Sequence, residues 1–282
     1  MELLTVKLLL VPLVVLLVAA EGGAALHRQR TRGDVAGSDL ADSLTSGGIG
    51  LVGQVVGGVF RWATYLLAGL VPAWASLRWS TDSPLGTAAE LIAAVLLWDF
   101  LFYWFHRAAH RTNLGWMSHR AHHESEYFNI AVALRLEWFP VLSVPIFATQ
   151  AFAGFGFGTM AAASIINGFY QGLLHTELVG PLPRPVESVF NTPTHHRSHH
   201  DITRVDGANF GSILIVWDRL FGTFVEPSSP RMHYGVMGAE PLRQPLAFLT
   251  PLVRVVPALA KPLDRGASRI AGTWEARRHG GA

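Results

Sequence analysis

Histidine is concentrated in three short segments of this chain. The 282 residues contain 13 histidines, and eight of them fall within three windows of five residues. The windows read HRAAH, HRAHH and HRSHH and begin at residues 106, 119 and 196. Because residues three and four positions apart lie on one face of a helix, each window would present two or three imidazoles to one side. This pattern favours a metal site over scattered surface histidines.

The type and number of these side chains limit which metal ions the histidines could bind, and how many. The candidate ligands in the windows are His106, His110, His119, His122, His123, His196, His199 and His200. Imidazole suits first-row ions, so ligand type alone leaves iron, zinc, copper and nickel open. The chain has no cysteine, which excludes thiolate ligands and cysteine-held iron–sulfur clusters. Since eight ligands exceed what one ion needs, the count favours two metals.

Two further residues are candidates for supporting the ligands. Asp99, His106 and His110 fall at i, i+7 and i+11 on one helical stripe. A ligating histidine usually donates its other ring N–H to a carboxylate or carbonyl, so Asp99 is predicted either to accept such a bond or to be a buried acid satisfied by a neighbouring helix. His195 precedes the third window and is predicted to lie beside the ligands, as a bystander or a hydrogen-bond donor.

Composition and hydropathy indicate a membrane protein. Charged residues make up 15% of the chain, against about 25% in soluble domains. Apolar blocks cover residues 3–20, 51–77 and 85–105, and a helix of about 20 residues crosses the hydrocarbon core. The first block could also be a cleaved signal peptide; we expect an uncleaved span. The basic residues form no stripe, so no nucleic-acid partner is expected.

A long uncharged segment should bring the three histidine windows to the same side of the membrane. Residues 138–176 contain no Asp, Glu, Lys or Arg, and one helix of that length would be about twice as long as the hydrocarbon core is thick. Gly154, Gly156 and Gly158 mark the expected turn of a hairpin. Such a hairpin returns the third window to the side of the second, and the third apolar block delivers the first window there.

The expected fold is all-α, a multi-span transmembrane helical bundle with a cytosolic histidine-rich metal-binding cap. Arginines flank the windows, and the positive-inside rule then puts the histidines on the cytoplasmic face. Three regions are predicted along the chain. Residues 1–48 form an N-terminal span and an exposed linker, residues 49–236 form a membrane catalytic domain, and residues 237–282 form a C-terminal tail.

Longer motifs around the histidines carry a resemblance to a known family. They read WDFLFYWFHRAAH, WMSHRAHHESEYFN and THHRSHHDITRVDGANFGSILIVWDRLFGTFVEP. Together they resemble the fatty acid hydroxylase and sterol desaturase superfamily of integral-membrane diiron oxygenases, over about residues 85–236. The resemblance implies two iron ions, O2 as co-substrate, and oxidation of a C–H bond in a sterol, fatty-acyl or related lipid. It also implies that His175 is a ninth ligand.

The resemblance also indicates which branch of the superfamily is most similar to this chain. Fatty acid 2-hydroxylases carry a histidine pair where this chain has Gln171 and His175, so the chain is more similar to the sterol desaturase and alkylglycerol monooxygenase branch. Alkylglycerol monooxygenases, however, carry an acidic residue where Arg111 stands. No segment resembles cytochrome b5, and we expect a separate electron donor of the ferredoxin or cytochrome b5 type with a reductase. Hydroxylation and desaturation share the first hydrogen abstraction, so both remain open.

A different class of protein remains as the alternative. A non-redox metal-binding membrane protein, such as a transporter or a sensor, could also need many histidines. Transporters typically carry their ligands near the membrane midplane on broken helices. Here the windows follow the spans and adjoin arginines, which favours an enzyme whose metals lie near the membrane surface.

Overall fold

The structure is a computed structural model that describes residues 2–32, 38–68, 79, 83–135, 144–203, 207–227 and 232–237. Within these residues the secondary structure is helical, and the one β feature is an isolated bridge between Phe190 and Leu214. The predicted all-α class is confirmed for this part of the chain. The predicted tail lies outside the described residues except for Met237.

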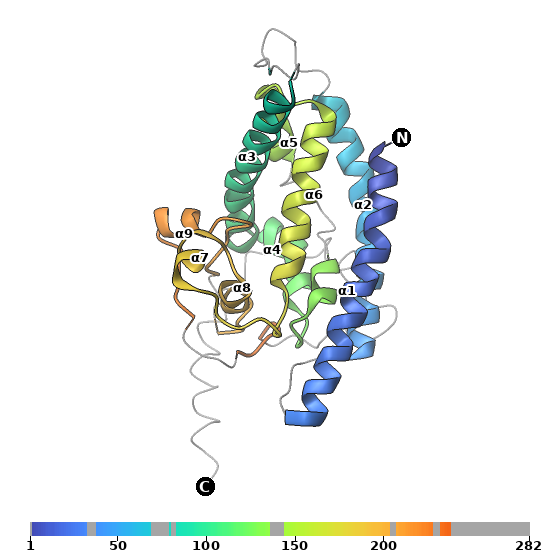
Figure 1. The fold of residues 1–282 in the computed structure, drawn as a ribbon, viewed down its shortest axis with the longest axis vertical. Helices are drawn as coiled ribbons and strands as arrows, with labels where there is room; N and C mark the ends of the chain where they lie inside the picture. The colour runs from blue at the N-terminus through green and yellow to red at the C-terminus, as the bar shows by residue number, and fades with distance from the viewer. Residues whose placement is uncertain are drawn as a thin grey trace.

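The helices form a long bundle with a compact group of short helices near one end (Figure 1). The bundle contains α1 (Glu2–Arg32), α2 (Leu40–Ala68), α3 (Pro84–Arg111), α5 (Val144–Phe152) and α6 (Phe157–Leu174). The short helices are α4 (Asn113–His123), η1 (Ile130–Leu134), α7 (Arg184–Val189), α8 (Pro193–His199) and α9 (Val216–Leu220). All three histidine windows lie where the short helices meet the C-terminal end of α3.

The predicted hairpin is confirmed. Helices α5 and α6 are joined by a tight turn in which Gly154 has a φ of 83°, a conformation that favours glycine. Both helices pack against α3. Trp98 meets Phe147 edge-on with ring centroids 4.9 Å apart, and the Gln150 side chain donates a hydrogen bond to the Ala94 carbonyl (2.8 Å). The hairpin therefore positions the end of α6 beside the end of α3.

One residue turns the chain between the first two windows. Thr112 ends α3 and begins α4, where its hydroxyl accepts a hydrogen bond from the Gly115 amide (3.1 Å). A β-carbon on Gly115 would lie 2.5 Å from the Cα of Ala109. Because no larger residue fits that gap, glycine is required for α4 to fold back onto α3. The fold-back brings the first and second windows face to face.

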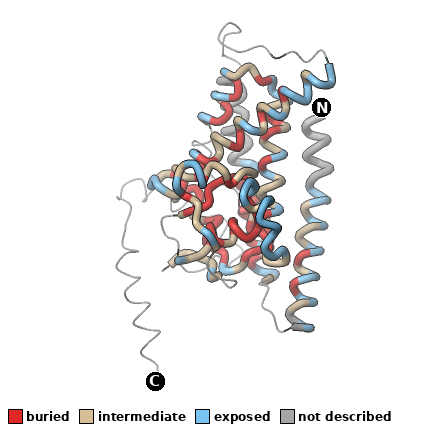
Figure 2. The backbone as a smooth tube through the Cα atoms, turned by 60° about the vertical axis from the view of Figure 1, so that its left-hand side comes forward, coloured by how far each residue is buried: buried red, intermediate tan, exposed pale blue. Residues whose placement is uncertain are grey.

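Burial is greatest around the histidines. Figure 2 shows the buried residues gathered where the short helices meet, while the long helices alternate between buried and exposed positions. Val11–Arg28 of α1 and Pro84–Arg111 of α3 are long and apolar enough to cross a membrane. Helix α3 packs one side against the bundle and leaves Leu85, Ile92, Leu96 and Trp104 exposed.

The exposed linker predicted at the end of the N-terminal region, residues 1–48, is wrong where the structure describes it. Residues 27–32 belong to α1 and residues 40–48 to α2, while residues 33–37 lie outside the described residues. Asp42, which is 1% exposed, accepts hydrogen bonds from Arg135 (2.5 Å) and from the Ser125 hydroxyl (2.9 Å). Arg135 also donates to the Ala121 carbonyl of α4 (3.3 Å). The prediction failed because a Gly- and Ser-rich composition gives no sign of the ion pair between Asp42 and Arg135, which are 93 residues apart in the sequence.

We expect Arg135→Met to unfold the protein more easily. The substitution leaves the Asp42 carboxylate buried without its cation, and breaking a buried pair in this way costs about 3–5 kcal/mol. The measurement is the melting temperature of the detergent-solubilised protein. Arg30→Met, at an exposed position of α1, is the matched control and should melt like the wild type. Equal melting of both variants would contradict a stabilising role for the pair.

Candidate metal centre

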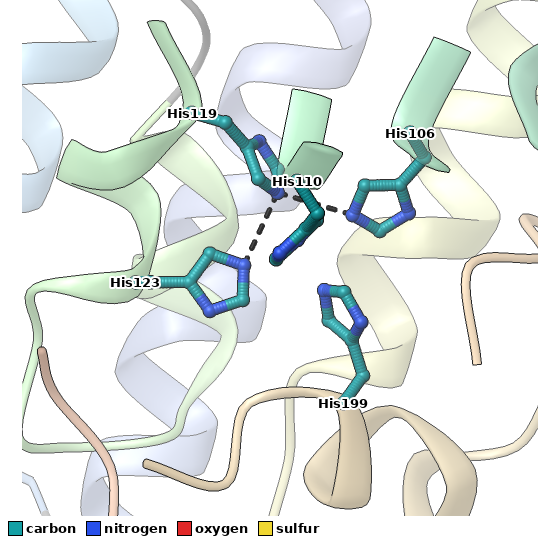
Figure 3. A group of neighbouring side chains, drawn as sticks. All are labelled: His106, His110, His119, His123 and His199. Atoms are coloured by element: carbon teal, nitrogen blue, oxygen red, sulfur yellow. Dashed lines mark hydrogen bonds between the residues drawn. The ribbon is translucent and has the colours of Figure 1, made fainter. Parts of the chain in front are cut away.

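Nine buried or nearly buried histidines form two neighbouring groups. The five-histidine group contains His106, His110, His119, His123 and His199, and the four-histidine group contains His122, His175, His196 and His200. Within each group, the candidate ligand nitrogens all lie within 4.8 Å of one another. The rings of the five-histidine group turn toward a common centre (Figure 3). These nine residues are the ones that the sequence analysis proposes as ligands.

Helices α4 and α8 each contribute to both groups. On α4, His119 and His123 face the five-histidine group while His122 faces the other. On α8, His199 belongs to the first group and His196 to the second, which His200 joins directly after the helix. The two groups are adjacent, because the His123 and His200 rings stack with centroids 4.2 Å apart. In the second and third windows, the doubled histidine divides the candidate ligands between the two groups, whereas both histidines of the first window belong to the five-histidine group.

Backbone carbonyls fix the orientation of four of the rings. The Nδ1 atom of His106 lies 2.9 Å from the Phe210 carbonyl oxygen, and that of His199 lies 2.7 Å from the Ala208 carbonyl oxygen. A carbonyl can only accept, so each Nδ1 carries the hydrogen and each Nε2 presents a lone pair. His122 and His175 are held in the same way, by the carbonyls of Val132 (3.3 Å) and Gln171 (2.8 Å).

The arrangement leaves several buried ring nitrogens without a hydrogen-bond partner. The Nε2 atoms of His122 and His175 are 3.1 Å apart, so their two lone pairs face each other, and the Nε2 atom of His196, 3.0 Å from that of His175, is the ring nitrogen beside them that can donate. The Nε2 atoms of His110, His199 and His200 are buried with no hydrogen-bond partner. Each unsatisfied buried group costs about 1–3 kcal/mol. A cation at the centre of each group would satisfy these nitrogens, so the residues present fit a metal pair.

Burial also keeps the imidazoles neutral. It lowers the pKa of His119 to about 3 and that of His175 to about 4. For His200, burial is the largest cause of a pKa well below the ordinary value, and neighbouring imidazoles add to it. Neutral imidazole is the form that binds metal ions. Neither group, as found among the described residues, includes a carboxylate, so bound cations would keep most of their charge.

The two predicted supporting residues do not contact the ligand rings as hydrogen-bond partners. Asp99 accepts from the backbone amides of Ile213 (2.6 Å) and Leu214 (3.2 Å) and from the Trp217 indole (2.8 Å). Its position explains this difference, because seven residues separate it from His106 and place it about 10 Å away along α3. Of the two predicted alternatives, the structure has the buried acid satisfied by a neighbouring segment.

His195 lies on the other side of α8 from the ligands. It is 1% exposed, and its ring meets Phe224 edge-on with centroids 5.4 Å apart. It belongs to neither histidine group. Of the two roles predicted for His195, the described contacts match a bystander, since adjacent residues of a helix point in different directions.

Asp218 is a residue that the sequence analysis did not connect to the ligands. Its carboxylate accepts from the amides of Phe210 and Gly211, both at 2.7 Å, and from the Thr223 hydroxyl (2.7 Å). Burial raises the pKa of Asp218, and these hydrogen bonds oppose the rise. The bonds hold the segment whose Phe210 carbonyl orients His106. The only sign of this role in the sequence is that Asp218 is an acidic residue within an apolar stretch.

The candidate site is therefore a pair of adjacent all-imidazole groups. The fatty acid hydroxylase family model matches residues 91–223, a range that includes all nine histidines. The human alkylglycerol monooxygenase is 34% identical over 199 residues, which cover 70% of this chain and 43% of the relative. The chain belongs to the fatty acid hydroxylase and sterol desaturase superfamily.

Other relatives extend the comparison. The zebrafish (Danio rerio) alkylglycerol monooxygenase is 42% identical over 49% of this chain and 31% of its own length. Ornithine lipid hydroxylase OlsE of Rhizobium tropici is 26% identical over 68% of this chain and 58% of its own length. The chain spans less than half the length of the two alkylglycerol monooxygenases. No solved structure matches the chain significantly.

We expect Asp218→Asn to weaken one metal centre selectively. Asparagine cannot accept from both backbone amides, so the Phe210 carbonyl would lose its fixed position beside His106. Changes of this kind typically lower metal affinity by about 10 to 100-fold. Metal titration of the metal-free protein should show weaker binding at the five-histidine group and unchanged binding at the other.

Asp201→Asn is the matched control, because the Asp201 carboxylate bonds the amide and hydroxyl of Thr203 within its own turn. That variant should bind both metals as the wild type does. Unchanged affinity in Asp218→Asn, or equal weakening of both centres, would contradict the proposed link from Asp218 to His106.

Proposed function

We propose that this protein is an O2-dependent diiron oxidoreductase that hydroxylates a C–H bond of a sterol, fatty-acyl or related lipid. The observation that carries the proposal is the convergence of nine neutral imidazoles into two adjacent groups. Several relatives are named as a monooxygenase or a hydroxylase of a lipid. Those names favour hydroxylation over desaturation here, and a polar lipid with an apolar chain as the substrate class.

The protein's own contribution is to hold two cations and exclude water. Two bound iron ions would supply O2 activation and the removal of hydrogen from an unactivated C–H bond. The nine Nε2 or Nδ1 atoms would hold these ions, and backbone carbonyls prevent four of the rings from rotating. Phe210 and Phe128, which are 0% and 1% exposed, pack against the rings. A dry, fixed site protects reactive chemistry from water.

The surface of α3 supports a membrane location for this chemistry. Ile92 and Leu96 are 60% and 47% exposed, and lipid is the solvent that suits such side chains in a long apolar helix. We propose a multi-span bundle in which α3 and the α5–α6 hairpin cross the hydrocarbon, with the histidine groups at the cytoplasmic face. A lipid chain would then reach the metals laterally. The catalytic domain is proposed to cover residues 49–236.

Electrons would come from a separate donor of the ferredoxin or cytochrome b5 type with its reductase. The alternative function, a metal-binding transporter or sensor without redox chemistry, would use the same histidines. The two functions differ in one measurable respect, because only the enzyme consumes O2 when it receives electrons and lipid.

Iron content and O2 uptake test the proposal together. Protein purified with iron should carry about two ions per chain, as the two groups indicate, and should consume O2 in the presence of a reductant and membrane lipid. His122→Ala should lose the metal of the four-histidine group and nearly all activity, a larger loss than the roughly 10 to 100-fold expected for a supporting residue.

His233→Ala is the control, since His233 is exposed and belongs to neither group. It should keep both ions and full O2 uptake. Two tightly bound ions without any O2 uptake would favour the transporter or sensor, and a single ion in the wild type would contradict the dinuclear site.

Single cysteines can test the topology, because the chain contains no cysteine of its own. Arg111 and Gly156 are both exposed, and nothing lies within 4 Å of a β-carbon added to Gly156. A membrane-impermeant maleimide applied from the cytoplasmic side should label Arg111→Cys but not Gly156→Cys. Labelling of both from the same side would contradict the proposed crossing of α3 and the hairpin.

A further inference from the structure

Helix α7 turns an apolar face away from the protein. Val186 and Val189 lie three residues apart on one side of the helix and are 36% and 40% exposed, and Leu182 before the helix and Phe190 after it are 37% and 40% exposed. On the opposite side, Glu187 accepts hydrogen bonds from the Leu182 amide (3.0 Å) and from the Thr192 hydroxyl at the start of α8 (3.2 Å). A surface helix in water would normally turn its apolar side inward.

The apolar face continues onto α9. Leu220 at the end of α9 is 69% exposed. The two helices lie side by side, since the Ile215 amide donates to the Val189 carbonyl (3.0 Å) and Arg219 donates to the Glu187 carbonyl (3.3 Å). We define the α7 surface as Leu182, Val186, Val189, Phe190 and Leu220. It comprises the exposed apolar side chains of two neighbouring helices outside the helical bundle.

The α7 surface begins at the depth where α3 would leave the hydrocarbon. Phe221, which follows Leu220, lies with its ring 4.9 Å from that of Trp104 on α3. Trp104 is 42% exposed, and the Arg107 guanidinium lies 5.5 Å from the centre of its ring. A tryptophan next to an arginine near the end of a span is typical of the membrane–water interface. Figure 1 shows α9 and α7 level with the C-terminal end of α3.

The charged residues beside the α7 surface also fit a membrane–water interface. Arg184 at the start of α7 and Arg219 in α9 are both exposed. Arginines beside an apolar helix face are attracted to the phosphates of anionic lipids, while the apolar side chains enter the acyl region. The sole acidic residue of α7, Glu187, is held on the protein side. This distribution matches a lipid surface better than an aqueous one.

We propose that the α7 surface lies in the cytoplasmic leaflet of the membrane and anchors the histidine-bearing cap to it. The proposal rests on the membrane crossing of α3 given under Proposed function. Interfacial helices bury their apolar face about 5–10 Å into the boundary between head groups and acyl chains. Helix α8 begins four residues after α7 ends, so the anchor holds His196 and His200 at the depth where a lipid chain would leave the bilayer.

Depth-dependent quenching tests the anchor directly in the full chain. Val186→Cys and the matched control Ser188→Cys, on the opposite side of α7, are labelled with a small fluorophore and reconstituted into phosphatidylcholine and phosphatidylglycerol vesicles. The probes are a nitroxide on the lipid acyl chain and aqueous iodide. The ratio of lipid quenching to iodide quenching should be several-fold larger at position 186 than at position 188.

Two results would overturn the anchor. Iodide quenching at position 186 equal to that at position 188 means that α7 is in water, and protection of position 186 from both quenchers means that protein covers it. Ile92→Cys on α3 separates this proposal from the membrane crossing on which it rests. Strong lipid quenching at position 92 with iodide quenching at position 186 rejects the anchor alone, whereas iodide quenching at position 92 rejects the crossing.

Discussion

The packing of nine neutral imidazoles into two buried groups is the constraint on which the rest of this structure depends. Backbone carbonyls accept hydrogen bonds from the Nδ1 atoms of His122 and His175, and the two Nε2 atoms then face each other at 3.1 Å. Burial keeps water from this contact and holds the pKa of His175 near 4. A cation within each group would satisfy the buried ring nitrogens that have no hydrogen-bond partner. The two groups adjoin at the stacked rings of His123 and His200.

The surrounding fold supplies the forces that hold the lone pairs together. Asp218 fixes the segment whose Phe210 carbonyl orients His106, and the buried pair of Arg135 and Asp42 ties α2 to α4. Gly115 lets the first and second windows approach, because any larger side chain would meet α3. The α5–α6 hairpin fixes the remaining distance, since it returns the chain to the end of the bundle that holds the histidines.

Spacing and composition predicted the parts of this account that depend on local pattern. The nine histidines followed from their windows and from family resemblance, and the hairpin followed from the length of an uncharged segment. Sequence could not predict the pairing of Asp42 with Arg135 or the role of Asp218, because their partners are distant side chains and backbone amides. It also could not predict how the second and third windows divide their histidines between the two groups, since the division depends on how α4 and α8 are oriented.

X-ray absorption at the iron edge of the purified protein reports the ligand atoms around each iron. If the two histidine groups hold the irons, the first shell is dominated by nitrogen, with outer-shell scattering from four to five imidazoles per iron, as the four- and five-histidine groups require. Thiolate ligands are excluded because the chain has no cysteine. A first shell dominated by carboxylate oxygen, or scattering from only one or two imidazoles per iron, would contradict the assignment of these groups as the metal centres.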